Sequence, residues 1–176
     1  MIGAGVIKGM AVTARNFIGS FFEADRLTTV QYPEERDEIE EAYRNFPFLV
    51  YDGADAMAGL RCTACKICEK ECPPKAIFII QDRDENGKAR KHPKVFNIDI
   101  TLCMSCQICV EVCPFNSIKM DKVYELSSAA RFDALVLGKT ALSKPNEYYH
   151  KIRPTEAGAV DAELAAAAEK KKAKPA

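Results

Sequence analysis

All eight cysteines of this 176-residue chain fall into two short runs with the same internal spacing. The runs are CTACKICEKECP, residues 62–73, and CMSCQICVEVCP, residues 103–114. Each cysteine of the first run recurs 41 positions later in the second, and Ile77 and Ile118, which lie beyond the runs, keep the same offset. A duplicated half-domain explains one constant offset more simply than two unrelated sites do. The fold is therefore expected to contain two equivalent cysteine loops.

Eight cysteines in a small chain can also form disulfides. A disulfide framework spreads its cysteines so that the bridges close long loops, whereas each set of four here falls within twelve residues. The N-terminal apolar stretch is interrupted by Lys8 and Arg15 and lacks the form of a secretory signal. We therefore expect reduced thiols in a reducing compartment.

Each run has the spacing C-x2-C-x2-C-x3-C-P, which is the ligand pattern of 4Fe-4S clusters in bacterial ferredoxins. Three thiolates on one tight loop can reach three irons of one cube, and in two-cluster proteins the fourth cysteine binds the other cluster. The sequence therefore predicts two 4Fe-4S clusters with crossed ligation. The expected ligands are Cys62, Cys65, Cys68 and Cys113 for cluster 1, and Cys103, Cys106, Cys109 and Cys72 for cluster 2.

Zinc is the main alternative metal, because CxxC pairs also form zinc ribbons. The third cysteine at the same spacing and the fourth before proline favour iron-sulfur clusters in both runs. Eight cysteines saturate two cubes, so His92 and His150 are expected to be solvated rather than to bind metal. Four isoleucines related by the offset are expected to pack over the clusters and exclude water: Ile67, Ile77, Ile108 and Ile118.

The remaining composition excludes several classes of function. The chain has 25 basic and 25 acidic residues, so no overall positive field favours nucleic acid. It contains no glycine-rich phosphate loop, no flavin or nicotinamide fingerprint and no histidine or carboxylate constellation for acid–base work. We expect a chain that relays electrons between its two clusters, with no catalytic residue and no direct small-molecule substrate.

The first 28 residues are expected to form an amphipathic helix. Its apolar face consists of Ile7, Met10, Ala11, Ala14, Phe17, Ile18 and Phe21. Charged residues interrupt the stretch, so it does not resemble a transmembrane helix. Two interpretations stay open at this point: a helix lying on a membrane or partner surface, and a helix packed on its own domain.

The fold class expected from the rest of the chain is α+β, a two-cluster ferredoxin-like domain with long flanking segments. The strands expected are FLVY (48–51), AIFII (76–80) and KVFNIDI (94–100), the last two joined as a hairpin through Asn86-Gly87. The expected segments are the helix (1–28), an extended acidic arm (29–59), the ferredoxin-like domain (60–122), a partner-wrapping extension (123–155) and a low-complexity, flexible tail (156–176).

Several stretches outside the cysteines resemble iron-sulfur chain I, the ferredoxin-like subunit of respiratory complex I (NADH:quinone oxidoreductase). These are RNF (15–17), TVQYPEE (29–35), VFNIDITLC (95–103) and YELSSAARFDALVLGKTAL (124–142), and the resemblance covers roughly residues 5 to 145. It implies a non-catalytic relay subunit of a translocase, at the junction of the peripheral and membrane arms, with its helix on the membrane arm. The resemblance therefore favours the interpretation in which the helix lies on a membrane or partner surface.

The same resemblance implies the partners and the location. Electrons would come from an upstream iron-sulfur chain and pass to the terminal-cluster subunit beside the quinone-site subunits and the membrane arm. The chain would be a peripheral membrane protein at the cytoplasmic face of a bacterial inner membrane.

The chain departs from the family pattern within the cysteine runs, at Thr63-Ala64, Met104-Ser105, Gln107 and Pro73-Pro74. None of these positions is a ligand, but they leave the electron donor and the type of complex open. The alternatives are the equivalent subunit of a membrane-bound hydrogenase or of a ferredoxin:quinone complex, and a free soluble 8Fe ferredoxin. A free carrier would need little beyond residues 60 to 120, and a zinc-stabilised adaptor is a weaker idea.

Overall fold

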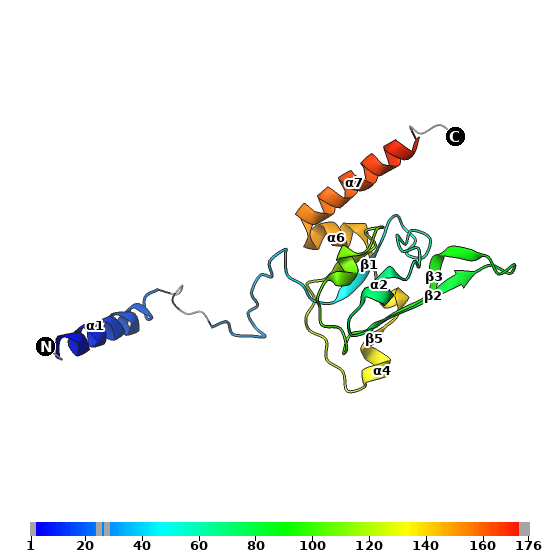
Figure 1. Cartoon of the computed structure of the whole chain (residues 1–176). Helices are drawn as coiled ribbons and strands as arrows, with labels where there is room; N and C mark the ends of the chain where they lie inside the picture. Colours follow the sequence, from blue (N-terminus) through cyan, green and yellow to red (C-terminus); the bar gives the residue numbers. More distant parts are fainter. Residues whose placement is uncertain (1–2, 24–25, 27–28, 173–176) are drawn as a thin grey trace. The chain divides into compact units, whose positions relative to one another are not determined.

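The computed structural model describes residues 3–23, 26 and 29–172, and the chain divides into two units, residues 1–38 and 39–176 (Figure 1). In the first unit, α1 runs from Gly3 to Gly19, and none of its residues, all of which are described, is buried. Phe17 and Phe21 stack edge to face with ring centroids 5.2 Å apart. A helix is therefore present in the predicted segment 1–28, but it ends at Gly19, and its apolar face is exposed. Residues 1–2, 24–25 and 27–28 of that segment lie outside the described part. In the described part of the chain, no helix has the length and apolar character needed to span a membrane.

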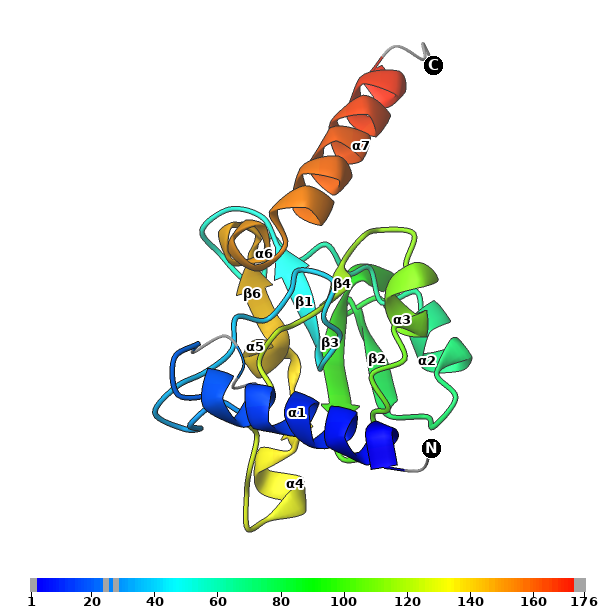
Figure 2. The same ribbon diagram turned by 90° about the vertical axis from the view of Figure 1, so that its left-hand side faces the viewer.

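The second unit contains a small sheet in the order β4-β1-β6. Its strands are β1 (Pro47–Tyr51), β4 (Ile118–Met120) and β6 (Ser143–Pro145). β1 pairs antiparallel with β4 and parallel with β6, and the three strands lie side by side in Figure 2. β1 contains the predicted FLVY strand, and it becomes the central strand of the sheet.

Both faces of β1 are covered. Leu49 belongs to the core that contains the cysteines, whereas Phe48 and Val50 pack into a second cluster with Tyr149 and Ala157. Successive side chains of a strand point to opposite faces, which explains why neighbouring residues enter different cores. The second cluster is built by α6 (Asn146–Ile152) and α7 (Pro154–Lys172).

A second sheet has the order β2-β3-β5, with β2 at Ile77–Arg83, β3 at Ala89–Asp99 and β5 at Val136–Leu137. β2 and β3 form the predicted antiparallel hairpin. Its turn is closed by the Gly87 N–H, which donates to the Asp84 carbonyl at 2.8 Å, and Gly87 has a φ of 75° that glycine adopts without steric cost.

Short helices complete the second unit: α2 (Ile67–Glu71), α3 (Ile108–Glu111), α4 (Arg131–Ala134) and α5 (Lys139–Leu142). α2 and α3 occupy equivalent places in the two cysteine runs and lie beside each other (Figure 2). The expected α+β class is confirmed. The segment expected as a flexible tail is helical in α7 as far as Lys172, and residues 173–176 lie outside the described part.

Gly59 closes the loop that leads from β1 to the first cysteine run. The Asp52 N–H donates to the Gly59 carbonyl at 2.9 Å, and the Asp52 carboxylate pairs with Arg61 through two contacts of 2.6 and 2.7 Å. A Cβ on Gly59 would lie 1.8 Å from the Asp52 carbonyl oxygen. The loop can therefore close this tightly only with glycine at residue 59.

We expect Gly59→Ala to lower the free energy of unfolding by about 1–3 kcal/mol, since the backbone must move to relieve the clash. Denaturant unfolding of the full chain measures this change. The matched control is Gly158→Ala in α7, where an added Cβ meets nothing within 4 Å and better helix propensity should raise stability by about 0.5–1 kcal/mol. Equal stability of the Gly59 variant and the wild type would contradict the expected clash.

Asp121 is a buried carboxylate that follows β4, with 4% of its surface exposed. It forms an ion pair with Lys144, and its Oδ1 accepts hydrogen bonds from the Tyr148 hydroxyl and the Lys122 N–H, both at 2.7 Å. Burial raises the pKa of Asp121, but the bonds from Lys144, Tyr148 and Lys122 together lower it below its ordinary value. The folded protein therefore favours the ionised carboxylate.

Because the folded pKa of Asp121 lies below the unfolded one, its stabilisation is present above the unfolded pKa of about 4 and is lost as pH falls through the folded pKa. We expect Asp121→Asn to be less stable than wild type by roughly 2 kcal/mol near pH 7, with the gap narrowing below about pH 4. Thermal melts of both proteins in matched buffers measure the gap. A gap that stays constant through this range would refute the assigned ionisation.

Candidate metal centre

The first cavity is lined by four cysteines, three from the first run and one from the second: Cys62, Cys65, Cys68 and Cys113. Its apolar walls include Leu49 of β1, Ile79 of β2 and Phe96 of β3, all of which are buried. Three sequence-distant strands therefore hold the loop of the first run against the end of the second. The space between the lining atoms, part of which is open to solvent, is about 340 Å³.

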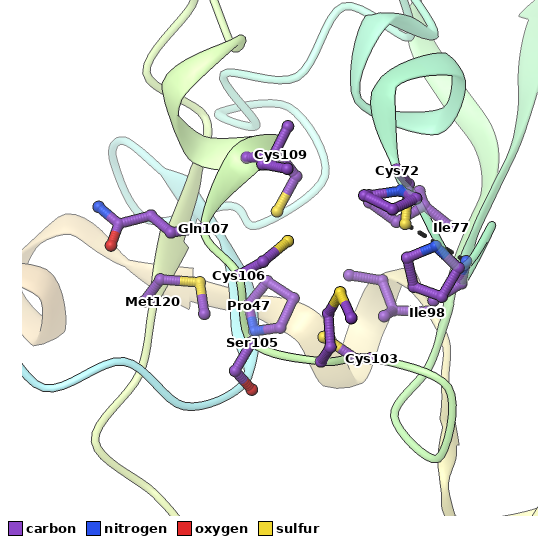
Figure 3. Close-up of a pocket in the computed structure, with 15 residues that line it drawn as sticks. Pro47, Cys72, Ile77, Ile98, Cys103, Ser105, Cys106, Gln107, Cys109 and Met120 are labelled. Carbon is purple, nitrogen blue, oxygen red and sulfur yellow. Dashed lines mark hydrogen bonds between the residues drawn. The ribbon is translucent and has the colours of Figure 1, made fainter.

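The second cavity has the complementary composition, and the space between its lining atoms, part of which is open to solvent, is about 370 Å³. Its cysteines are Cys72 from the first run and Cys103, Cys106 and Cys109 from the second. Figure 3 shows their sulfur atoms pointing into one space, with Pro47 and Met120 on one wall and Ile77 and Ile98 on another. The fourth cysteine of each run thus lies in the cavity of the other run, as the predicted crossed ligation requires. The ligand sets themselves stay a prediction.

The two cysteine loops share an unusual backbone conformation. Three pairs of non-glycine residues related by the 41-residue offset have positive φ: Ala64 (55°) and Ser105 (53°), Lys66 (63°) and Gln107 (71°), Lys75 (54°) and Asn116 (49°). Left-handed conformations cost such residues roughly 1–2 kcal/mol each, and alternating left- and right-handed residues form concave nests of N–H groups that bind anions, Fe–S sites included. Both loops therefore carry the same strain, in the form that suits a sulfur-rich anionic group.

The first strained residue of each loop turns its main-chain N–H toward a cysteine. In each loop this main-chain group lowers the pKa of that thiol, Ala64 acting on Cys62 and Ser105 on Cys103, against the larger effect of burial, which raises it. Just after each run, the N–H groups of Lys75 and Asn116 donate to the carbonyls of the fourth cysteines, at 3.2 and 3.4 Å. The duplication seen in the sequence is thus repeated in hydrogen bonding.

Burial makes these thiols poor acids. Burial, together with the neighbouring thiols, raises the pKa of Cys62 to about 11 and those of Cys68 and Cys109 to about 12. For Cys62 the neighbours include Cys113, and for Cys109 they include Cys72, so the thiols that share a cavity also interact electrostatically. Four thiolates in one dry cavity need positive charge to replace the lost protons, and metal binding is coupled to proton release in this way.

The donor set fits two iron-sulfur clusters. All eight cysteines are free thiols rather than disulfides. In the described part of the chain, no three or more His, Cys, Asp or Glu side chains are grouped to hold a single metal ion. Each cavity is lined by four cysteines, and a cubane cluster spreads its four thiolates over four irons.

The other residues singled out from the sequence lie where their chemistry suggests. Ile67 and Ile118 line the first cavity, and Ile77 and Ile108 line the second; Ile67 is 37% exposed and so covers its cavity less completely than expected. His92 is exposed in β3. His150 bonds the Asp161 carboxylate at 2.7 Å and lies outside both cavities.

Sequence reasoning missed the serines beside the sulfurs. Ser117 lines the first cavity, and Ser105 lines the second. The signal was present in the repeat, since the offset pairs Ser117 with Ala76 and Ser105 with Ala64. A comparison of the two copies at every non-cysteine position would have found both differences.

Comparisons with known proteins agree with this chemistry. Residues 61–117 match a family described as a 4Fe-4S dicluster domain. A relative from Symbiobacterium thermophilum, named NADH-quinone oxidoreductase subunit I 2, is 36% identical over 125 residues, which cover 70% of this chain and 48% of the relative. A relative of the same name from Geobacter metallireducens is 27% identical over 139 residues, 79% of this chain and 97% of the relative. The resemblance inferred from sequence is thereby confirmed.

The chain spans about half the length of the Symbiobacterium relative. Among solved structures, this chain matches a chain of the membrane-bound sulfane sulfur reductase, an archaeal respiratory membrane complex, with a TM-score of 0.48 and 22% identity. The match covers 79% of this chain and 68% of the reductase chain. A TM-score below 0.5 is too low to establish a shared fold.

Proposed function

Because residues 61–117 are a 4Fe-4S dicluster domain and the curated relatives are named subunit I of NADH-quinone oxidoreductase, we propose that this chain is an electron-relay subunit of such a complex. It carries electrons through two 4Fe-4S clusters toward a terminal cluster and quinone. The observation that carries the proposal is the pair of neighbouring four-cysteine cavities, each completed by a cysteine from the other run. A single-cluster protein would have no use for the second.

The proposed ligands of cluster 1 are Cys62, Cys65, Cys68 and Cys113, and those of cluster 2 are Cys72, Cys103, Cys106 and Cys109. When bound, each cluster supplies one-electron transfer. The chain's own contribution is to hold the two sites in one rigid core: α2 and α3 pack on each other, and all of the buried cysteines belong to one hydrophobic cluster. Two sites in one core support a relay in which an electron enters at one and leaves at the other.

The protein residues also exclude water and protons from the sites. The walls of both cavities are almost entirely apolar, and the buried strand residues Leu49, Phe96 and Ile98 close them from behind. A dry environment keeps the thiolates bound to metal and limits cluster hydrolysis. The chain itself performs no bond chemistry in this proposal, and it is a non-catalytic subunit of the translocase.

The proposed partners are an upstream iron-sulfur chain, the terminal-cluster subunit, the quinone-site subunits and the membrane arm. The proposed location is the cytoplasmic face of a bacterial inner membrane, with peripheral contact. The exposed apolar side chains of α1 and of the turn that follows it support such contact: Ile7, Met10, Phe17 and Phe21 are each about two-thirds exposed, between 66% and 71%. Within the segment 123–155, β5, β6 and α6 pack on the chain's own sheets, so the proposed partner-wrapping role is restricted to residues 123–135.

The test is gentle detergent extraction of membranes from cells that express the full chain with an affinity tag, followed by identification of the co-purifying subunits. The proposal expects subunits that bind quinone and flavin, together with more than about eight irons per copy of this chain, because its own two clusters hold eight and the partner subunits carry further clusters. Recovery with hydrogenase subunits would move the chain to that complex, and recovery of the chain alone from the soluble fraction would identify a free ferredoxin. Either result rejects the proposed complex.

A matched pair of variants tests the helix within the same experiment. Phe17→Gln combined with Phe21→Gln removes the stacked apolar pair at the C-terminal end of α1 and in the turn that follows it, and should release the chain from the membrane fraction. Arg15→Gln, on the other face of the same helix, should leave it there. Equal retention of the two variants would show that the apolar face makes no such contact.

A further inference from the structure

Ser117 places a hydroxyl in the wall of the first cavity. The residue is 1% exposed and lines the cavity together with Cys62 and Cys113. Its backbone is fixed, because the Val50 N–H donates to the Ser117 carbonyl at 2.7 Å. Its Oγ has no hydrogen-bond partner among the described protein atoms. A buried hydroxyl without a partner is costly, so this one is expected to serve a group that occupies the cavity.

The thiol that this hydroxyl influences is that of Cys62. The Ser117 hydroxyl lies close enough to lower the pKa of the Cys62 thiol, although burial raises that pKa to about 11 overall. The Ser117 hydroxyl and the Cys62 sulfur do not reach hydrogen-bond geometry in the folded chain. The hydroxyl is therefore available to the thiolate and to the sulfide of a bound cluster.

The second cavity lacks this hydroxyl. The residue equivalent to Ser117 is Ala76, which is 5% exposed and lines the second cavity. The Ala76 main-chain N–H donates to the Cys72 sulfur at 3.4 Å, but its side chain has no donor. The two copies thus present the same wall position with a hydroxyl in one cavity and a methyl group in the other.

A second serine is present in the second copy and replaced by alanine in the first. Ser105 lines the second cavity, and its equivalent in the first copy is Ala64. Ser105 is only half-buried, and a hydrogen bond open to water has a smaller electrostatic effect than one in a dry cavity. The Ser117 hydroxyl is therefore expected to have a larger electrostatic effect on its cavity than the Ser105 hydroxyl has on the other. Ser105 supplies an internal control for the effect of burial.

Reduction adds one electron, donated by an upstream iron-sulfur carrier, to the cluster with its four thiolates, and makes the net charge of that unit more negative by one. No bond breaks, and the proton stays on the Ser117 Oγ. A hydrogen bond donated to a cluster sulfur is stronger for the more negative state, and hydrogen bonds to the sulfurs are among the factors that set cluster potentials. We propose that Ser117 raises the reduction potential of the cluster held by Cys62, Cys65, Cys68 and Cys113.

This inference rests on the proposed ligand sets, and Ser117 acts as a positioning and tuning residue, not a ligand. The test is an EPR-monitored redox titration of the complex that contains the full chain. Ser117→Ala should make reduction of cluster 1 less favourable by about tenfold, the typical effect of one hydrogen bond, which equals ~59 mV for a one-electron couple. The potential of cluster 2 should not change.

The reciprocal variant is Ala76→Ser, which should raise the potential of cluster 2 alone, and the double exchange should shift both potentials in opposite directions. Ser105→Ala should lower the reduction potential of cluster 2 by less than Ser117→Ala lowers that of cluster 1. The signal of cluster 1 is identified independently as the one that Cys113→Ala abolishes.

The outcomes separate this inference from the proposed function. If Cys113→Ala abolishes the cluster 1 signal but Ser117→Ala leaves its potential unchanged, or shifts both clusters equally, the tuning role is rejected and the ligand sets stand. If wild type lacks two distinct 4Fe-4S signals, or Cys113→Ala abolishes the same signal as Cys103→Ala, the ligand sets fail first.

Discussion

Replacing Cys72 by alanine is expected to remove or damage cluster 2 and to leave cluster 1 intact, although Cys72 belongs to the first cysteine run. The reason is geometric: the Cys72 thiol lines the second cavity, and it raises the pKa of Cys109 together with Cys103 and Cys106. Iron content should fall from about eight toward about four per chain. Iron and sulfide analysis combined with EPR of the reduced protein measures both effects.

The matched variant is Cys113→Ala, which should have the mirror effect on cluster 1. Cys65→Ala provides the reference, because Cys65 belongs to the first run and also lines the first cavity. Loss of the same EPR signal in Cys72→Ala and Cys65→Ala would show that each run holds its own cluster, and the crossed ligation would then be wrong. Because each crossed cysteine joins the two halves, both variants are also expected to unfold more readily than wild type.

Tyr149→Ala is expected to lower the free energy of unfolding by about 3–5 kcal/mol, the usual cost of truncating a buried aromatic side chain. Tyr149 has no exposed surface, and its ring stacks edge to face with Phe48 of β1 at 6.4 Å. The Lys119 ammonium lies 5.3 Å from the ring centroid on the β4 side. Tyr149 therefore joins α6 and α7 to the outer face of the central strand.

The control is Tyr149→Phe, which keeps the ring and removes only the hydroxyl. Burial, and then the Glu156 carboxylate, raise the pKa of Tyr149, but the hydroxyl has no partner at hydrogen-bond geometry, so its removal should cost less than about 1 kcal/mol. Denaturant unfolding gives the stabilities, and hydrogen exchange at residues 146–160 shows where packing is lost. An alanine variant as stable as the phenylalanine variant would mean that α6 and α7 do not stabilise the core.

The parts of the fold that the sequence predicted correctly depend on residues close to one another in the chain. Asn86-Gly87 between two apolar runs predicted the β2–β3 hairpin, and the FLVY stretch predicted β1. Local turn chemistry and side-chain alternation are enough for such elements. The parallel pairing of β6 with β1 was not predicted, because Ser143 and Leu49 are distant in sequence and nothing in the short SKP segment indicates a strand partner.

The candidate site divides in the same way. The cysteine spacing and the 41-residue offset predicted two equivalent loops, but the left-handed backbone at Ala64 and Ser105 was not predicted, since these are not glycines. Nor did the sequence indicate that Ser117 is buried beside the Cys62 sulfur, because its burial depends on β1 and on the cavity walls supplied by other strands.

By itself, the sequence determined the chemistry: eight thiols in two identical runs, each with the ligand pattern of a 4Fe-4S cluster, because ligand spacing is a local property of the chain. Only the tertiary structure decided which thiols share a cavity, which wall positions carry a hydroxyl and how α6 and α7 cover the central strand. Those features depend on segments far apart in sequence packing against one another, and long-range packing is decided by the whole set of burial and pairing interactions at once.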